Sequence, residues 1–240
     1  MKRLVVTIAT VIGTCGAAHS QMLHPGYGTL GAPQSNFLSS SYLSQQVMND
    51  TTFKQRLGAS GSARSGTNAL AGIGSITFES SPAASSVAVK LARQYPAAAR
   101  AEAERVFREL LAGYGQIERR FGVPSRDLAG SVAAFLAGSY MAYRNVDFPD
   151  ENFKPLVAQM RGAIGSKPEI AKASNAEKQE FYEQMAIMGM FMASTQRALK
   201  QRPDPQIAAN MRQAAKGYLE QFLNTDADRV QITAQGLVLR

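Results

Sequence analysis

The sequence predicts an all-α protein, a single helical bundle of about five or six helices with a flexible N-terminal leader and a short C-terminal strand. Three observations predict this class. Apolar residues recur at helical spacing after residue 82, helix-start and helix-stop residues separate these stretches, and two of the stretches carry almost no charge. A helix that is apolar all round has to be buried, so we expect those two stretches to form the interior.

The first of the two stretches is the predicted helix at 174–202. Ser174 followed by Glu177 has the spacing of a capping box, and the part from 185 to 193 contains no polar side chain. We therefore expect this helix to be surrounded by other helices. Its small residues, on which a second helix backbone can approach closely, are Ala186, Gly189 and Ala193.

The second stretch lies in the helix predicted at 126–144, for which Ser125 is the expected cap. The part from 128 to 143 has no charged side chain. It is just below the usual transmembrane length, and its serines and tyrosines suit a core helix better than a membrane span.

Periodicity and helix-stop residues also place the outer elements of the domain, which spans 82–224. Further helices are predicted at 87–93, 97–121, 152–164 and 206–223, with a short turn around Ile170 and Ala171. In the tail, 225–240, apolar residues alternate after Arg229, which predicts a short strand or a docked tail.

Residues 1–20 have the pattern of a secretory signal peptide, with Lys2 and Arg3 before an apolar run. Cleavage is expected after Ser20, which predicts an exported protein, periplasmic or secreted. The alternative is a lipoprotein with Cys15 as the lipidated residue, and we disfavour it because Thr14 is a poor residue before such a cysteine.

Signal cleavage limits the chemistry of the mature chain. Cys15 is the only cysteine, and His24 would be the only histidine left. Thiol nucleophiles, Ser-His-Asp triads and multi-histidine zinc sites are therefore excluded in practice, and the chain has no P-loop or dinucleotide-binding turn. We expect no catalytic residue, no cofactor and no metal.

The segment 21–81 is rich in Gly and Ser and buries too little apolar area to offset its ordering entropy. We expect a leader of low order. The alternative is a partner-binding arm that orders on contact, with a short helix at 41–57 and a short strand at 73–78.

The middle of the chain combines the apolar stretches after Leu128 and Phe181, the Tyr140/Tyr143 pair and the run Gln159-Met160-Arg161. Through these features it shows a resemblance to a family of secreted bacterial proteins of unknown function. The resemblance covers residues 96–223. It implies an all-helical exported domain and attaches no catalytic residue.

Two sets of acidic residues could form functional sites, one for calcium binding and one for glycoside cleavage. Asn224-x-Asp226-x-Asp228 has the alternation of a calcium loop, but the positions for the obligatory Gly and Glu hold Arg229 and Gln235. A helix end with an Asp cap is the better interpretation. Carboxylate pairs for glycoside cleavage are conceivable on the helices; the candidates are Glu180 and Glu183 with Glu109 or Glu118.

The formal net charge is +8, or +6 without Lys2 and Arg3 (8 − 2). Arg119, Arg120 and Arg126 gather at one corner between helices, a candidate contact for an anionic envelope component such as lipopolysaccharide or a wall polymer. The plainer alternative is that the charge aids solubility. Export argues against nucleic acid.

These observations favour a non-enzymatic exported binding or interaction protein with an unknown protein or anionic envelope component as partner. The alternative is a membrane-active protein whose two apolar helices insert as a hairpin. Membrane contact is not favoured, and a glycoside-cleaving enzyme ranks third.

Overall fold

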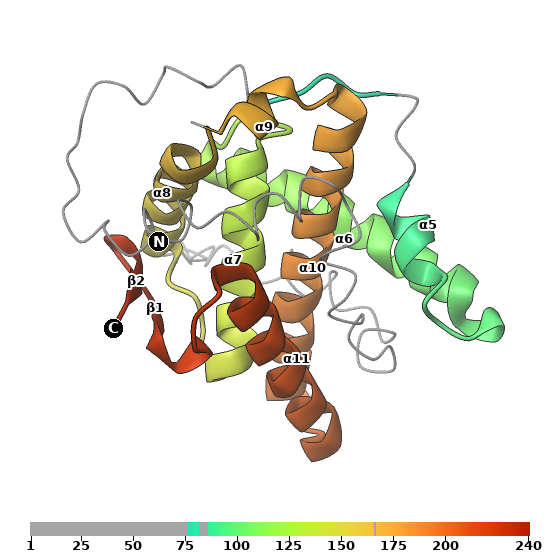
Figure 1. Ribbon diagram of the computed structural model, residues 1–240. Coiled ribbons are helices and arrows are strands. Elements are labelled where there is room, and N and C mark those ends of the chain that lie inside the picture. The colour runs from blue at the N-terminus through green and yellow to red at the C-terminus, as the bar shows by residue number, and fades with distance from the viewer. Residues whose placement is uncertain (1–75, 82–85, 166) are drawn as a thin grey trace, which may run out of the picture.

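The computed structural model describes residues 76–81, 86–165 and 167–240, and it confirms the all-α class (Figure 1). The α-helices are α5 (Val87–Ala92), α6 (Arg100–Phe121), α7 (Leu128–Arg144), α8 (Phe153–Gly165), α9 (Pro168–Lys172), α10 (Asn175–Gln201) and α11 (Pro205–Leu223). Short 3-10 helices cover Ala97–Ala99, Asp150–Asn152 and Ala227–Arg229, and strands β1 (Val230–Thr233) and β2 (Gly236–Leu239) close the chain. The predicted signal, most of the leader and the helix at 41–57 lie outside the described residues.

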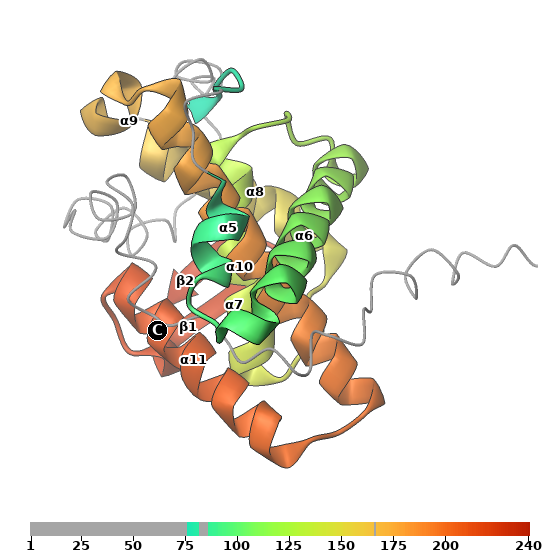
Figure 2. The same ribbon diagram turned by 90° about the vertical axis from the view of Figure 1, so that its right-hand side faces the viewer.

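Helices α7 and α10 run side by side through the middle of the bundle (Figures 1 and 2). Their uncharged stretches are buried, as the sequence predicts. The predicted close approach is also confirmed, because a Cβ added at Gly138 would lie only 2.0 Å from the carbonyl oxygen of Gly189. The two glycines therefore let the helix backbones touch. In the described part of the chain, no helix is both long and apolar enough to span a bilayer.

Local sequence predicts the first residue of α10 correctly but not that of α7. Ser174 and Glu177 form the predicted capping box. The predicted cap at Ser125 is wrong: Asp127 caps α7, and its Oδ1 accepts a hydrogen bond from the backbone N–H of Ala129 at 2.8 Å. The reason is that Arg126 adopts a positive φ of 60°, which a right-handed helix cannot contain.

The outer helices cover the two central ones. Helices α5 and α6 pack together, α6 also packs on α10, and α8 and α11 pack on α7. Helix α9 is the region predicted only as a turn. The described residues from 86 to 240 therefore contain seven α-helices, where six were predicted. Helix α11 begins at Pro205 because Asp204 caps it, its Oδ1 accepting from the N–H of Ile207 at 2.9 Å.

The packed chain begins upstream of the expected boundary at 82. Ile76 is fully buried, and the ring of Phe78 packs edge-on against Tyr182 with centroids 5.4 Å apart. Of the strand expected at 73–78, the described part forms a single antiparallel bridge, between Thr77 and Asp127. Residues 76–81 therefore belong to the helical domain.

The C-terminal tail forms an antiparallel hairpin, in which Ile232 pairs with Leu237. The side-chain amide of Gln159 in α8 holds the free edge of β2, because its Oε1 accepts from Leu237 N at 2.7 Å and its Nε2 donates to Leu237 O at 2.9 Å. Gly236 has a φ of +99°, and an added Cβ there would lie 2.6 Å from Gln159 Oε1. The strand is thus fixed to the bundle by side-chain hydrogen bonds.

Candidate functional site

A pocket lies where the C-terminal ends of α7 and α10 meet the N-terminal half of α11. Its volume is about 520 Å³, within the range of small-molecule sites. The connection between α10 and α11 projects at the bottom of the molecule beside this pocket (Figures 1 and 2). The lining residues are Ala142, Asn145, Gln196, Leu199, Lys200, Pro203, Asp204, Pro205, Ala208, Ala209, Met211 and Arg212.

Local sequence explains why the three helices leave space here. Helix α7 ends at Asn145, which adopts a left-handed φ of 53°. Helix α10 continues beyond the end of α7 and ends at Gln201. Two prolines, Pro203 and Pro205, follow and shape the connection to α11. The alanines of α11 that face the pocket are too small to fill it.

One buried polar atom in the pocket wall has no partner. Gln196 is only 3 % exposed, and its Nε2 donates to Asn145 Oδ1 at 3.3 Å. Its other amide atom, Oε1, is buried without a hydrogen-bond partner in the described structure. Leaving a buried acceptor unsatisfied costs about 1–3 kcal/mol, so this amide lowers the stability of the fold at the edge of the pocket.

The pocket also has a positive side. Lys200 forms an ion pair with Asp147 at 2.8 Å, and the hydrogen bond from Lys200 lowers the pKa of that carboxyl. Arg212 lies over the ring of Tyr143 with its Cζ 5.5 Å from the centroid, and none of the described carboxylates pairs with it. One cation of the pocket is therefore uncommitted.

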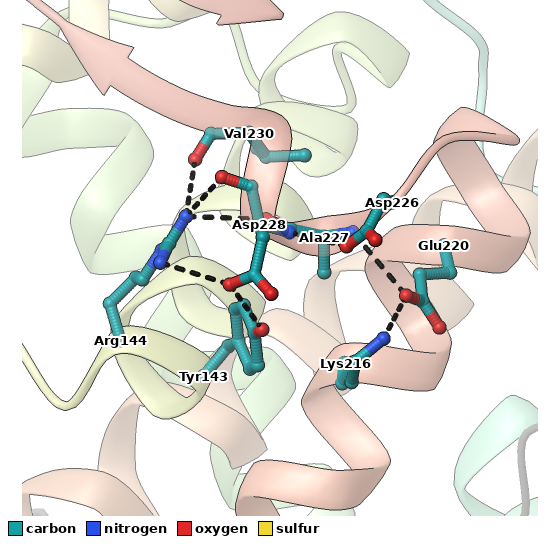
Figure 3. A network of polar contacts seen from close by, with 8 residues as sticks. All are labelled: Tyr143, Arg144, Lys216, Glu220, Asp226, Ala227, Asp228 and Val230. Carbon is teal, nitrogen blue, oxygen red and sulfur yellow. Dashed lines mark hydrogen bonds and ion pairs between the residues drawn. The ribbon is translucent and has the colours of Figure 1, made fainter. Parts of the chain in front are cut away.

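A polar network around Tyr143 holds the ring on which Arg212 lies (Figure 3). The hydroxyl of Tyr143 donates to Asp228 Oδ1 at 2.7 Å, and this hydrogen bond raises the pKa of Tyr143. Arg144 donates to the same carboxylate at 3.2 Å and to the Asp228 carbonyl at 2.6 Å. Helix α7 is thereby tied to the turn that precedes β1, and the ring under Arg212 is held in place.

The same network decides between the interpretations of the Asn224-x-Asp226-x-Asp228 pattern. Asn224 ends α11, and Asp226 Oδ1 accepts from Asp228 N at 2.8 Å as the cap of the following 3-10 helix. The helix end with an Asp cap is confirmed. Across the described residues, His, Cys, Asp and Glu nowhere gather in a group of three that suits a metal ion.

The three arginines of the predicted anionic contact have different surroundings. Arg120 pairs with Asp150, and Arg126 lies 3.6 Å from a carboxylate oxygen of Glu79. Arg119 lies in the last turn of α6 and pairs with none of the described carboxylates. Two of the three charges are thus partly neutralised inside the chain, and contact with an anionic partner stays a prediction.

The glutamates considered for glycoside cleavage have structural partners. Glu180 pairs with Lys90 at 2.8 Å, and Glu183 accepts from Val87 N at 3.2 Å, so both join α10 to α5. Glu109 pairs with Arg105 on α6. Glu180 and Glu183 thus join two helices, whereas the Glu109 pair lies within α6.

Glu118 belongs to a buried polar cluster beneath residues 76–81. It is 3 % exposed and accepts from Tyr182 Oη at 2.8 Å and from Arg126 N at 3.1 Å. Burial raises the pKa of its carboxyl, and the nearby Asp127 adds to the rise. Asp127, fully buried, pairs with Arg161 of α8. The carboxylates of Glu118 and Asp127 join the corner before α7 to α10 and α8, while Arg161 Nε is left without a hydrogen-bond partner in the described structure.

Sequence reasoning did not find the pocket, because its residues come from three helices. The available signal was Gln196, a polar residue at helical spacing from Met192 and Leu199 on a helix predicted to be buried. The arrangement combines a buried acceptor, an uncommitted cation and an apolar floor. Its lining contains no histidine, cysteine, serine or threonine.

The comparisons with known proteins add the family. No curated protein and no solved structure matches the chain. A family model, described as a family of unknown function (DUF6683), matches residues 1–240, well beyond the 96–223 of the expected resemblance. The chain therefore belongs to the DUF6683 family of unknown function.

Proposed function

We propose that this protein is a non-enzymatic binding protein, that it acts after export, and that the pocket between α7, α10 and α11 is its binding site. The pocket itself is the observation that carries the proposal. It is a hollow of about 520 Å³ with apolar lining from Ala142, Leu199 and Met211 and with Arg212, which pairs with none of the described carboxylates. A concave, mostly apolar pocket with a few polar groups is the usual form of a small-molecule site.

The surroundings of the pocket support binding rather than catalysis. Between residues 76 and 240 the sequence has no histidine and no cysteine. Asp204, the acidic residue in the lining, uses its Oδ1 to cap α11. General acid–base catalysis needs a positioned group that titrates near the working pH, and the lining offers none.

The binding part of the proposal is tested by filling the pocket. Ala209→Trp places a large ring in the lining, and Ala158→Trp, at an exposed position of α8, is the matched control. Saturation-transfer NMR of the purified chain against a library of small metabolites should find compounds that bind the wild type and Ala158→Trp but not Ala209→Trp. A library without a binder, or binders indifferent to Ala209→Trp, would refute the site.

Export is tested separately. The full chain, expressed in a Gram-negative host, should be recovered from the periplasm or medium with Gln21 as its first residue. Recovery in the cytoplasm with the first twenty residues attached would refute this part of the proposal.

The membrane-active hairpin remains the alternative. Helices α7 and α10 are each other's packing partners through Gly138 and Gly189, so insertion would first have to open the centre of the bundle. Leakage of dye from anionic liposomes at neutral and acidic pH would support the hairpin. Leakage at the level of buffer alone leaves the binding protein as the better account.

A further inference from the structure

Residues 76–81 form a short strap that crosses the bundle near the N-terminal end of α10 (Figure 1). The ring of Phe78 packs edge-on against Tyr182 with centroids 5.4 Å apart, and the backbone N–H of Ser81 donates to Gln179 Oε1 at 2.8 Å. These attachments lie outside the contact between α7 and α10. Segments held by few contacts open locally while the rest of a domain stays folded, so the strap can leave the bundle without separating the central helices.

Glu118, next to the strap, is a buried carboxylate without a cation as its partner. It is 3 % exposed and accepts from two neutral donors, the hydroxyl of Tyr182 at 2.8 Å and the backbone N–H of Arg126 at 3.1 Å. No described basic side chain forms an ion pair with it, because the guanidinium of Arg126 lies 3.6 Å from Glu79 of the strap instead. Burial without a counter-ion disfavours the charged form of a carboxyl group.

The other ionisable groups around Glu118 do not balance its charge. Asp127 is a second buried carboxylate, and Arg161 of α8 is paired with it. Tyr114 of α6 stays neutral because burial raises the pKa of its hydroxyl, and Glu183 of α10 adds a further negative charge. Burial, and then the charge of Asp127, therefore raise the pKa of the Glu118 carboxyl.

The strap touches the same residues that hold this carboxylate. Phe78 packs on the ring of Tyr182, whose hydroxyl donates to Glu118. Thr77 forms its antiparallel bridge with Asp127, the residue directly after the second donor. Separation of the strap from the bundle therefore removes the cover of both donors, and water can then reach the carboxylate.

We propose that the strap is a pH-sensitive switch, which stays bound while Glu118 carries a proton and is released when that proton is lost to solvent. The neutral carboxyl suits a buried site whose donors are neutral. The ionised carboxylate is better stabilised by water, which it gains when Phe78 leaves the ring of Tyr182. Residues 76–81 are therefore bound at acidic pH and released as pH rises.

The equilibrium between bound and released strap depends on pH through two pKa values of Glu118. With the strap released, the carboxyl has its ordinary pKa of about 4.3. With the strap bound, its pKa is raised. The equilibrium constant for release therefore rises by up to about tenfold per pH unit between these two values, and it is constant above the higher one.

Hydrogen exchange of the full chain, followed by mass spectrometry between about pH 4 and about pH 8, measures this equilibrium. Each rate is divided by the intrinsic rate at the same pH, which gives the protection of each peptide. Protection of a peptide containing Ser81, whose N–H is freed from Gln179 on release, should fall by up to about tenfold per pH unit and then level off. Peptides from the centre of α10 around the buried Met188 should keep their protection.

Glu118→Gln removes the titrating group and keeps an oxygen that accepts from Tyr182, so protection of the strap should no longer depend on pH. Glu109→Gln changes an exposed glutamate of the same helix, and it is the matched control that should behave like the wild type. Tyr182→Phe is a second test that does not depend on the folding of Glu118→Gln. It keeps a ring under Phe78 but removes a donor to the ionised carboxylate, so the total loss of strap protection should be about tenfold larger than in the wild type.

Strap protection that stays constant with pH, or that falls equally in Glu118→Gln, overturns the switch. A parallel fall at the centre of α10 overturns the strap as the moving part, because the whole bundle would then loosen. A loss in Tyr182→Phe no larger than in the wild type overturns the role of the buried carboxylate. The pocket between α7, α10 and α11 takes no part in these measurements, so the proposed binding function stands or falls separately.

Discussion

Gly189→Ala tests whether contact between α7 and α10 organises the bundle. A Cβ at this position would lie 2.4 Å from the carbonyl oxygen of Ala134 and 2.6 Å from the backbone nitrogen of Phe135. Both atoms belong to the backbone of a buried helix, so no side chain can rotate away. Because ordinary contact begins near 3.4 Å, the helices would have to part locally by about 1.0 Å (3.4 − 2.4).

The magnitude follows from two opposing effects. A gap of about 0.5–1 Å forfeits a quarter to a half of each dispersion contact, and overpacking a core costs about 1–3 kcal/mol. The clash with backbone places Gly189→Ala at the upper end of that range. Alanine is the better helix former by about 1 kcal/mol, which leaves a net loss of about 2 kcal/mol. For a chain of this size that is a drop of about 4–8 °C in Tm.

The assay is thermal and urea unfolding followed by circular dichroism, with Gly217→Ala as the control. Gly217 lies in α11, and a Cβ there would meet no atom within 4 Å. The same exchange should therefore raise stability, by about 0.5–1 kcal/mol. A Gly189→Ala protein as stable as the wild type would show that α7 and α10 do not need to touch here.

Three further predictions test other parts of the structure. Phe191→Ala should cost about 3–5 kcal/mol in urea unfolding, because the ring is fully buried against Phe107; a Tm shift of a degree or less would contradict its placement. Gly236→Ala should cost about 1–3 kcal/mol, since it combines a φ of +99° with a clash against Gln159, and unchanged stability would refute the hairpin geometry. Burial raises the pKa of Glu118, so its neutral form is favoured by folding, and its contribution is complete below the unfolded pKa and is lost as pH rises through the folded pKa. The stability of Glu118→Gln relative to the wild type should therefore increase with pH across that window in urea titrations, and a constant difference would contradict the shift.

The helices were predictable because their signals are local. The capping box at Ser174 and the small face at Gly189 each need only neighbouring residues, and the structure confirms both. The cap of α7 was misassigned because Ser125 and Asp127 are both good caps. The choice between them depends on the left-handed conformation of Arg126, whose backbone N–H is held by Glu118 of another helix. A contact between elements thus decided a helix end.

Local sequence signals could not predict the geometry of the hairpin or the pocket, because both depend on residues that are distant in sequence. The turn before Gly236 depends on Gln159, which is distant in sequence and occupies the space that a side chain at 236 would need. The pocket depends on how far α10 extends past the end of α7 at Asn145, and periodicity gives helix phase but not the relative heights of neighbouring helices. Only Gln196, a polar residue at helical spacing from Met192 and Leu199, hinted at it.

The residues that carried the family resemblance now have structural roles. Gln159 holds the edge of β2, Met160 is fully buried, and Arg161 pairs with the buried Asp127. Tyr143 anchors the turn before β1 through Asp228. In this chain Gln159 and Tyr143 join α8 and α7 to the C-terminal tail, and Arg161 joins α8 to the start of α7, so these polar residues have roles in folding. Function is better sought at the pocket between α7, α10 and α11, whose lining includes none of them.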